Sequence, residues 1–490
     1  MKKLNKIIAV LFILLMTFPN TVFAAEAPPE VVAQTAILGE VSTGKIIYQK
    51  DMDKKMYPAS MTKLLTAIVA LEHLKPDDLI TVGSEINEIP ADSSKAGHTR
   101  GETLTVKNLI RGLLIPSGND SANVLAVTVA RKIENNQELP YEECIKVFTE
   151  LMNQKAKQLG ATNSHFANAH GYHDENHYTT AHDMFFISQE ALKNETIAEI
   201  TKEKGYSGDG VEGDIVEFEN DTLNIKAYNW TNHNLLVTDN EYQYEYVTGL
   251  KTGFTDEAGD CLSAAAQKDD ITLIAVVFHS EDPARWTDTR ALFEYGFSNF
   301  DMLNLQKSGD VVDTVALSKH NRLLGDTLNI VVKEDISEYM LKEEVETVEK
   351  VIEYKSDFVE EQKNKEDNTT KLKAPISTAE PIGKITYKKA QNEVIKETDI
   401  YAEKEVEKGT ILTTIKYFFQ NLTDNLFSFS LKGVAVVIGI IAAIIALLAG
   451  IIAVMVSRRN RRRRSKYIFK TNRRRHSRND GPRMRRRRRR

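Results

Sequence analysis

The chain has 490 residues, a formal net charge of −5, 42% hydrophobic residues and 27% charged residues. This length and apolar content allow two or three domains with real cores. Only two cysteines, Cys144 and Cys261, are present, which excludes a fold built on a framework of disulfides. Because Cys144 falls in a helical pattern and Cys261 in a predicted core strand, we expect two buried free thiols rather than one disulfide.

The first 24 residues have the form of a cleaved signal peptide. Three lysines give a basic start, an apolar run follows at residues 7–15, and the segment ends in Val22-x-Ala24. A basic start, an apolar centre and a small residue at the cleavage point are typical of export signals. We therefore predict an exported protein from which residues 1–24 are removed.

The first motif is Ser60-Met-Thr-Lys63, at the start of an apolar run with helical spacing. The pattern predicts that Ser60 opens a buried helix and that Lys63 lies one turn further on the same face. A serine hydroxyl becomes a nucleophile when a base removes its proton, and burial at the positive end of a helix disfavours the ammonium form of a lysine. Ser60 and Lys63 are therefore candidates for nucleophile and general base. Taken alone, an N-cap serine and a surface lysine would explain the same residues.

The second motif, Ser117-Gly-Asn119, lies in a loop between two helical patterns. Such a loop can direct two short polar side chains into a cleft. Ser117 is a candidate proton relay to the leaving group. The Asn119 amide can accept from Lys63 and donate to a substrate carbonyl at once. By themselves these residues would also suit a turn and a helix N-cap.

The third motif, Lys251-Thr252-Gly253, belongs to a predicted strand at residues 246–255. Apolar runs at residues 258–266 and 271–278 predict two further strands in meander order. Strand alternation places the side chains of Lys251 and Gly253 on one face and that of Thr252 on the other. Taken alone, this motif would also suit a surface lysine beside a glycine at a strand end.

The chemistry of the third motif suits the end of an extended peptide. Lys251 offers positive charge to a substrate carboxylate, and Gly253 lets an extended chain approach the backbone. The backbone N–H groups of Phe254 and Ser60 are candidates for an oxyanion hole.

The order and spacing of the three motifs form a joint constraint that single motifs lack. With them, the chain resembles the low-molecular-mass penicillin-binding proteins, which are serine-type D-alanyl-D-alanine carboxypeptidases. The resemblance covers residues 32–300, and it includes residues 36–48, similar to the first hairpin of the family, and 171–184, similar to a segment beside its active site. It implies an α/β (α+β) penicillin-binding and β-lactamase-like transpeptidase fold, with an antiparallel sheet and a helical subdomain.

The resemblance also implies roles for individual residues. It makes Ser60 the acylated nucleophile, Lys63 the general base, Ser117 the proton relay, Asn119 the partner of substrate and lysine, and Lys251 with Thr252 the anchors of the terminal carboxylate. Gly253 and Phe254 complete the predicted substrate-binding set. The implied reaction releases D-alanine from peptidoglycan stem peptides through an acyl-enzyme. β-Lactams are the implied inhibitors, and no metal or organic cofactor is implied.

Other functions share parts of this pattern. A β-lactamase shares the first steps, but no Glu-x-x-Leu-Asn segment lies between Ser117 and Lys251 to position a hydrolytic water. Transpeptidation or endopeptidase cleavage would need only a different acceptor or substrate. A catalytically idle wall scaffold would have no need for the intact motifs. His173 and His177 have a spacing that suits a metal on a helix, but their segment reads as a loop and lacks a His-Glu-x-x-His motif.

The part of the chain after the predicted catalytic domain, residues 25–305, changes in character. Alternating apolar residues predict a small β-rich domain at residues 306–402, similar to the β domain that follows the catalytic domain in this family. Within it, residues 343–367 are rich in Glu and Lys, which indicates a strand flanked by solvated loops.

The C-terminal segments predict attachment to a membrane. Residues 411–431 fit an amphipathic interfacial helix, and residues 433–456 form an uncharged run long enough to span a bilayer. Residues 457–490 carry 17 Arg and 2 Lys against one Asp, a net charge of +18, so the remainder of the chain carries −23. The arginines favour the cytoplasmic side and contact with anionic lipid. Nucleic acid is the less favoured partner for this tail.

This charge distribution predicts the topology of the chain in the membrane. A protease added to intact protoplasts should remove the catalytic domain and leave an epitope fused after Arg490 protected, because moving so many arginines across a bilayer is costly. The alternative is an anchor formed by residues 411–431 with the tail outside. Digestion of the epitope in intact protoplasts would support that alternative.

Overall fold

The computed structural model describes residues 27–211, 224–321, 325–360 and 370–417, together with residues 439, 442, 446 and 449–457. The predicted signal peptide lies outside the described residues, as do nearly all of the basic tail and most of the predicted interfacial and transmembrane helices. Residues 411–417 are helical, with Ile411 and Leu412 largely exposed. Among the residues that the structure describes, no helix is both long and apolar enough to cross a membrane.

The chain divides into two compact units. The first extends to Ser308 and adds Glu334–Val351 and Ile385–Thr398, and the second contains Gly309–Lys333, Ile352–Lys384 and the residues from Asp399 onward. All three sequence motifs lie in the first unit.

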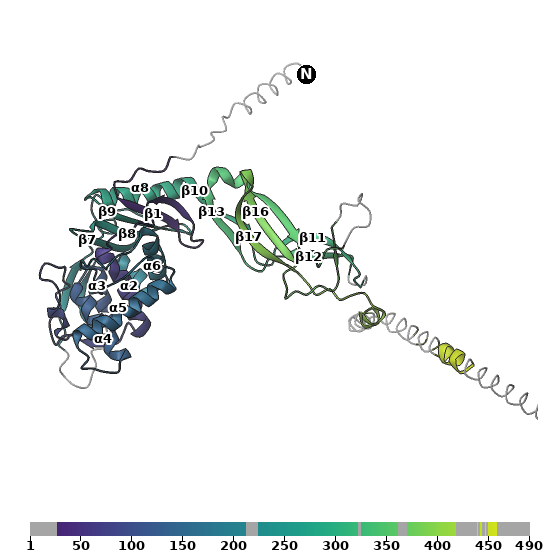
Figure 1. Cartoon of the computed structure of the whole chain (residues 1–490), viewed down its shortest axis with the longest axis horizontal. Coiled ribbons are helices and arrows are strands. Elements are labelled where there is room, and N and C mark those ends of the chain that lie inside the picture. The colour runs from purple at the N-terminus through teal and green to yellow at the C-terminus, as the bar shows by residue number, and fades with distance from the viewer. Residues whose placement is uncertain are drawn as a thin grey trace, which may run out of the picture. The chain divides into compact units, whose positions relative to one another are not determined.

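The first unit is built on a five-stranded antiparallel sheet with the order β2-β1-β9-β8-β7. Its strands are β1 (Thr35–Glu40), β2 (Ile46–Lys50), β7 (Val247–Thr255), β8 (Gly259–Lys268) and β9 (Ile271–Ser280). The predicted meander of the last three strands is confirmed, and it leaves β7 at the edge of the sheet. The inner strands are apolar in nearly continuous runs because both faces of the sheet are covered (Figure 1).

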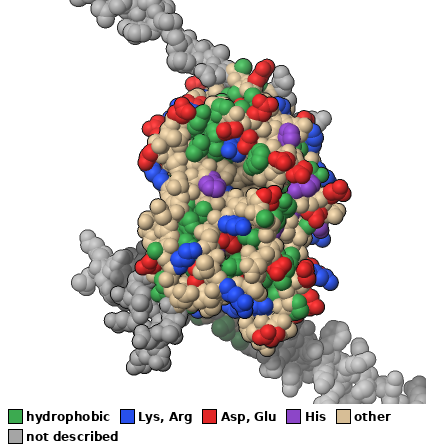
Figure 2. Space-filling model, turned by 90° about the vertical axis from the view of Figure 1, so that its left-hand side faces the viewer, with side chains coloured by type: hydrophobic (Ala, Val, Ile, Leu, Met, Phe, Trp, Pro, Cys, Tyr) green, Lys and Arg blue, Asp and Glu red, His purple; other side chains and the backbone are tan. Residues whose placement is uncertain are grey.

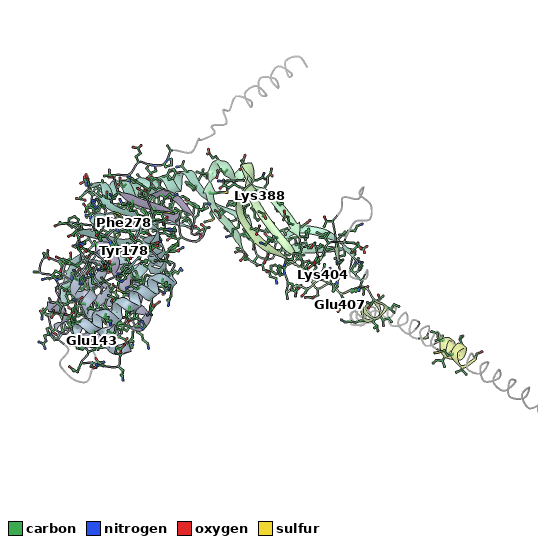
Figure 3. All side chains as sticks on the ribbon, viewed as in Figure 1. Glu143, Tyr178, Phe278, Lys388, Lys404 and Glu407 are labelled. Carbon is green, nitrogen blue, oxygen red and sulfur yellow. The ribbon has the colours of Figure 1, made fainter. Side chains whose placement is uncertain are left out.

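One helix, α8 (Ala284–Asn299), covers one face of this sheet, and a helical region covers the other (Figure 1). The α8 side packs Trp286, Leu292 and Phe293 against the sheet. On the opposite side, α6 (Ala181–Lys193) contacts β9 and β1. Figure 3 shows Phe278 of β9 within the sheet and Glu143, from the first turn of α5 (Tyr141–Gln158), at the far end of the helical region.

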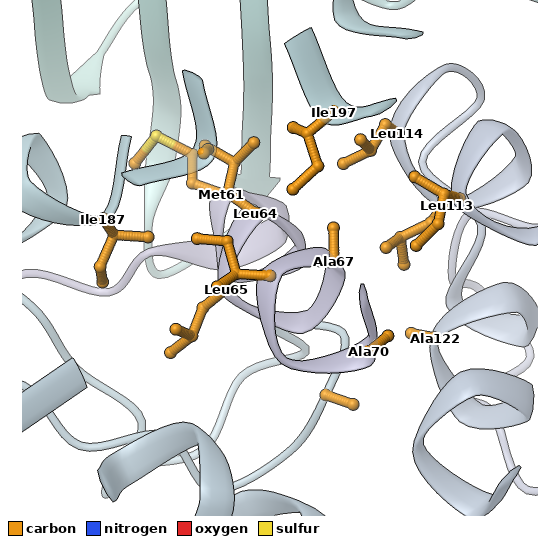
Figure 4. Close-up of a cluster of buried hydrophobic side chains, with 14 of the residues drawn as sticks. Met61, Leu64, Leu65, Ala67, Ala70, Leu113, Leu114, Ala122, Ile187 and Ile197 are labelled. Atoms are coloured by element: carbon orange, nitrogen blue, oxygen red, sulfur yellow. The ribbon is translucent and has the colours of Figure 1, made fainter. Parts of the chain in front are cut away.

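The helical region surrounds one central helix, α2 (Lys63–His73), in which every residue from Lys63 to Ala70 is buried. A helix that is apolar all round is stable only when other elements cover every face. Its neighbours are α3 (Val106–Leu114), α4 (Asn119–Ile133), α5 and α6. Figure 4 shows side chains of α2 meeting those of the surrounding helices, among them Leu113, Leu114, Ala122, Ile187 and Ile197.

Shorter elements complete the first unit. They are the 3-10 helices η1 (Ala59–Thr62) and η2 (Ser84–Asn87), the helix α7 (Glu195–Lys202), and the strand pairs β3 (Leu79–Thr81) with β4 (Thr103–Thr105) and β5 (Gly205–Asp209) with β6 (Ala227–Thr231). Both cysteines are free and buried, Cys144 on α5 and Cys261 on β8, which confirms the prediction.

The C-terminal part is β-rich, as predicted. Two strands, β10 (Phe300–Gln306) and β13 (Ile336–Leu341), form a pair. A six-stranded sheet has the order β14-β16-β17-β12-β11-β15. Its strands are β11 (Val311–Ser318), β12 (Thr327–Val331), β14 (Glu349–Tyr354), β15 (Lys371–Lys373), β16 (Gly383–Lys389) and β17 (Glu393–Ala402), with 3-10 helices η5 (Lys342–Thr347) and η6 (Ala390–Asn392).

One glycine of the first unit allows a loop to lie directly on η1. Gly171 has φ +83°, and a Cβ added there would lie 1.8 Å from the Ala59 carbonyl oxygen. An L-residue is therefore disfavoured both by its backbone conformation and by a clash with backbone that cannot move aside.

We expect Gly171→Ala to lower the free energy of unfolding by about 2 kcal/mol or more, because the strained conformation and the clash act together. Gly44→Ala is the matched control, since Gly44 also has a positive φ (+70°) but nothing within 4 Å of an added Cβ. Chemical denaturation of the purified variants measures both changes. Equal losses at the two positions would show that the contact with Ala59 contributes nothing.

Candidate active site

The first motif forms a tight turn that brings Ser60 and Lys63 together. Ser60 lies in η1, and Lys63 is the first residue of α2. The predicted opening turn is thus a 3-10 helix, which continues into the buried α-helix. The Lys63 ammonium donates to Ser60 Oγ at 2.6 Å. This is the contact expected of a nucleophile and its base.

Two further acceptors complete the surroundings of Lys63. Its Nζ donates to Asn119 Oδ1 at 2.7 Å and to the His170 carbonyl oxygen at 2.9 Å. With Ser60 Oγ, these satisfy all three donors of an ammonium group. No carboxylate forms an ion pair with it among the described residues, although the Lys63 side chain is fully buried.

The pKa of Lys63 is therefore well below its ordinary value. Burial is the main cause, because it penalises the charged form, and the positive charge of Lys251 lowers the pKa further. Asp120 acts in the opposite direction. A lysine with a lowered pKa can exist as a neutral amine near neutral pH, as a general base requires.

The second motif lies between α3 and α4. Ser117 has φ +61°, and Asn119 is the first residue of α4; both side chains are buried. Asp120 holds this turn against a neighbouring loop, because its carboxylate accepts from the backbone N–H groups of residues 96, 97 and 98 at 2.8 to 3.0 Å. Asp120, which directly follows the Ser117-Gly-Asn119 motif, thus attaches the motif to the rest of the helical region.

The third motif packs β7 directly against η1. A Cβ added to Gly253 would lie 2.8 Å from the Pro58 carbonyl oxygen and 3.3 Å from the Met61 nitrogen. Any larger residue would push the strand away from the turn that holds Ser60. Phe254 follows on the same strand, with its side chain 59% exposed.

Lys251 is buried, and its ammonium lies next to the following residue of its own strand, Thr252. Its Nζ lies 3.2 Å from the Thr252 carbonyl oxygen and 3.3 Å from Thr252 Oγ1. Strand alternation predicts that the Lys251 and Thr252 side chains lie on opposite faces, yet the flexible lysine stem brings the ammonium to its neighbour. Burial, and after it the charge of Arg285, lowers the pKa of Lys251 to about 7.

A cavity of about 810 Å³ joins the motifs. The predicted site residues that line it are Ser60, Ser117, Asn119, Thr252, Gly253 and Phe254. Lys63 and Lys251 lie behind this lining. The face of the first unit seen in Figure 2 carries many acidic side chains, with histidines among them.

Residues that the motifs did not predict also line the cavity, among them Asp92, Tyr172, His233, Asp256, Glu257 and Arg285. Arg285 forms an ion pair with Asp260 at 2.5 Å. Burial, Lys251 and Lys63 lower the pKa of His233 to about 4. Tyr172 belongs to the segment 171–184 that the sequence placed beside the active site, whereas the other residues of this group lie outside the three motifs and are brought to the cavity by the fold.

The histidines between residues 165 and 182, which include His173 and His177, contact separate partners. His177 contacts Thr62, His182 contacts Asp53, and His165 contacts the carbonyl oxygen of Asn176. Within the described part of the chain, no group of three or more His, Cys, Asp or Glu residues is arranged to hold a metal ion.

Comparison with known proteins gives consistent matches. Residues 21–282 match the family model for D-alanyl-D-alanine carboxypeptidases, and residues 300–408 match the model for the penicillin-binding protein 5 C-terminal domain. D-alanyl-D-alanine carboxypeptidase DacF of Bacillus subtilis is 30% identical over 416 residues, which cover 82% of this chain and 95% of the relative. Escherichia coli DacC is 32% identical over 59% of this chain and 67% of the relative.

The fold points to the same family. The crystal structure of penicillin binding protein 5 from Haemophilus influenzae aligns with a TM-score of 0.60 at 25% identity, covering 78% of this chain and all of that one. Together with the family model, which matches more than half of the residues, and the full-length relative, this places the chain in the D-alanyl-D-alanine carboxypeptidase family, as the sequence motifs predicted.

Proposed function

We propose that the protein removes the terminal D-alanine from peptidoglycan stem pentapeptides through an acyl-enzyme on Ser60. The observation that carries this proposal is the contact of 2.6 Å between Lys63 Nζ and Ser60 Oγ at the wall of the cavity. Lys63 removes the hydroxyl proton, Ser60 attacks the carbonyl of the penultimate residue, and D-alanine leaves. Water then hydrolyses the ester.

The surroundings of Lys63 favour its role as base. A neutral amine has two N–H groups and one lone pair. Asn119 Oδ1 and the His170 carbonyl oxygen can only accept, so they take the two N–H groups. The lone pair then points to the third neighbour, the Ser60 hydroxyl. The two acceptors orient the base as well as bind it.

The edge strand β7 offers a binding surface for an extended peptide. Its Gly253 presents backbone to the cavity, and Thr252 presents a hydroxyl. We assign the substrate's terminal carboxylate to Lys251 and Thr252. The backbone N–H groups of Phe254 and Ser60 serve as the oxyanion hole, and Ser117 passes the proton to the leaving amine.

Carboxypeptidase, endopeptidase and transpeptidase activities share this chemistry and differ in the substrate or acceptor. Incubation of the purified protein with a pentapeptide, with a cross-linked dimer and with an added amine acceptor separates them. Release of free D-alanine from the pentapeptide as the main product supports the proposal. Products only from the dimer or the acceptor would contradict it.

We also propose that the protein is held at the cell membrane by its C-terminal segments, with the catalytic domain outside. The uncharged run of residues 433–456 and the net charge of +18 in residues 457–490 support this placement. The exposed Ile411 and Leu412 are in keeping with an apolar surface next to lipid.

Penicillin should form a stable adduct at Ser60, because β-lactams mimic the D-alanyl-D-alanine end and acylate the same hydroxyl. Ser60→Ala should abolish labelling by a fluorescent penicillin on a denaturing gel. Ser93→Ala is the matched control, since Ser93 also lines the cavity but is given no catalytic role. Labelling that survives Ser60→Ala would contradict the assignment of the nucleophile.

Lys251→Gln should slow acylation by carboxylate-bearing substrates. The activation free energy should rise by about 1.5 to 3 kcal/mol, the range for a charge-assisted hydrogen bond. The advantage of the wild type should decline as the pH rises above 7, because Lys251, with a pKa of about 7, then loses its charge. Acylation rates are compared across pH for a peptide acid and the corresponding amide. An equal effect on both substrates would remove the carboxylate from this contact.

A further inference from the structure

His177 is a buried histidine that the proposed chemistry does not use. Its Nε2 lies 2.8 Å from Thr62 Oγ1, and its Nδ1 accepts from the Ala167 backbone N–H at 3.2 Å. Because a backbone N–H can only donate, Nδ1 carries no proton and Nε2 carries one. The ring therefore donates to Thr62. Burial lowers the pKa of His177 to about 3, against the influence of Asp174, so the ring is neutral at neutral pH.

The two hydrogen bonds of His177 reach two segments that both adjoin Lys63. Thr62 stands directly before Lys63 in η1. Ala167 begins the stretch that carries the His170 carbonyl, which accepts from Lys63. The ring thus links η1, which carries Ser60, to the segment whose His170 carbonyl oxygen orients Lys63.

The same stretch is also attached to η1 and α2 by other contacts, among them the close approach of Gly171 to Ala59. The Thr66 hydroxyl donates to the Ala169 carbonyl at 2.6 Å, and Asn168 Oδ1 accepts from the Gly171 N–H at 2.7 Å. The first bond fixes the stretch to α2, and the second only closes its own turn. Without the two hydrogen bonds of His177, the segment that carries the His170 carbonyl would keep its local turn but would lose one of its attachments to η1.

A small displacement of that carbonyl matters because it is one of two acceptors that direct the lone pair of Lys63 toward Ser60. Catalytic geometry is sensitive to shifts of about 1 Å. Resting on the proposed roles of Ser60 and Lys63, we propose that His177 is a positioning residue for acylation, which acts through Thr62 and the His170 carbonyl and touches neither substrate nor reacting atoms.

Two substitutions separate the two bonds of the ring. Asparagine places its amide oxygen near the position of Nδ1, so His177→Asn keeps an acceptor for Ala167 and loses the donor to Thr62. Glutamine places its amide nitrogen near the position of Nε2, so His177→Gln keeps the donor to Thr62. Thr62→Val removes the same bond from the other side with little change in shape.

The measurement is the acylation of the full-length protein by a fluorescent penicillin over a range of concentrations. We expect His177→Asn and Thr62→Val each to lower the saturating acylation rate about tenfold, the size of one hydrogen bond, with the half-saturating concentration unchanged. His177→Gln, which keeps the donor to Thr62 but loses the acceptor for Ala167, should lower the rate to a similar extent, because it breaks the same link at its other end. The double variant His177→Asn with Thr62→Val should be no slower than Thr62→Val alone, because both remove one interaction.

Ser164→Ala is the control variant. It tests whether loosening the segment around residues 164–183, without loss of the bond to Thr62, is enough to lower the acylation rate. Ser164 donates to Asp183 at 2.6 Å and bonds to Thr179 at 2.8 Å, so it anchors the same segment without contact with η1. We expect it to lower the melting temperature while acylation stays near the wild-type rate. If His177→Asn does not fold, Thr62→Val carries the test.

Several results would overturn the proposal. These are an unchanged rate in Thr62→Val or in His177→Gln, additive losses in the double variant, or the same loss in Ser164→Ala. Failure of the proposed function is seen separately, because the wild type would then form no adduct or Ser60→Ala would keep it.

Discussion

The first unit depends on one interaction, the burial of the Lys63 amine among acceptors that carry no formal charge. A buried ammonium without a carboxylate partner is disfavoured, and this lowers its pKa. The three acceptors come from three separate parts of the chain: η1, the start of α4 and the segment before Gly171. The fold must therefore bring these parts within hydrogen-bond distance of one buried atom, and the central position of α2 achieves this.

The turn that carries Ser60 is enclosed by backbone on two sides. Gly253 of the edge strand approaches Pro58 and Met61, and Gly171 approaches Ala59, in both cases too closely for a side chain. Backbone packed against backbone leaves little freedom for the turn to move. If Ser60 is the nucleophile, as proposed, a hydroxyl held this firmly needs little reorganisation at the moment of reaction.

Four basic side chains lie close to the cavity: Arg285 and His233 in its lining, and Lys63 and Lys251 behind it. Burial is the largest cause of the lowered pKa of Lys63, Lys251 and His233; after it, Lys251 lowers the pKa of Lys63, Arg285 lowers that of Lys251, and both lysines lower that of His233. These groups stay close together at some cost in repulsion, which a bound carboxylate would relieve. The arrangement that lowers the pKa of each basic group in the free protein therefore suits the anionic substrate that we propose, and it assists the deprotonation of Lys63 in its proposed role as general base.

Local patterns in the sequence determined a large part of this structure. The apolar run after Ser60 predicted the buried helix, the apolar runs after Lys251 predicted the meander, and Cys144 and Cys261 were correctly expected to be free. These features follow from the spacing of side chains along a few turns or strands, so they are visible in the residues themselves. The three motifs likewise named the residues that now meet around Ser60.

Only the tertiary structure decided the rest. The third acceptor of Lys63 is a backbone carbonyl 107 residues away, and backbone carbonyls are alike in every residue, so no pattern marks this one. The bond from His177 to Thr62 spans 115 residues, and the spacing of the histidines gave no indication of it. The direction of the Lys251 ammonium follows from the flexibility of its stem and from burial, which strand alternation does not describe. Contacts between distant segments depend on how the sheet and helices pack, and that packing is a property of the whole chain.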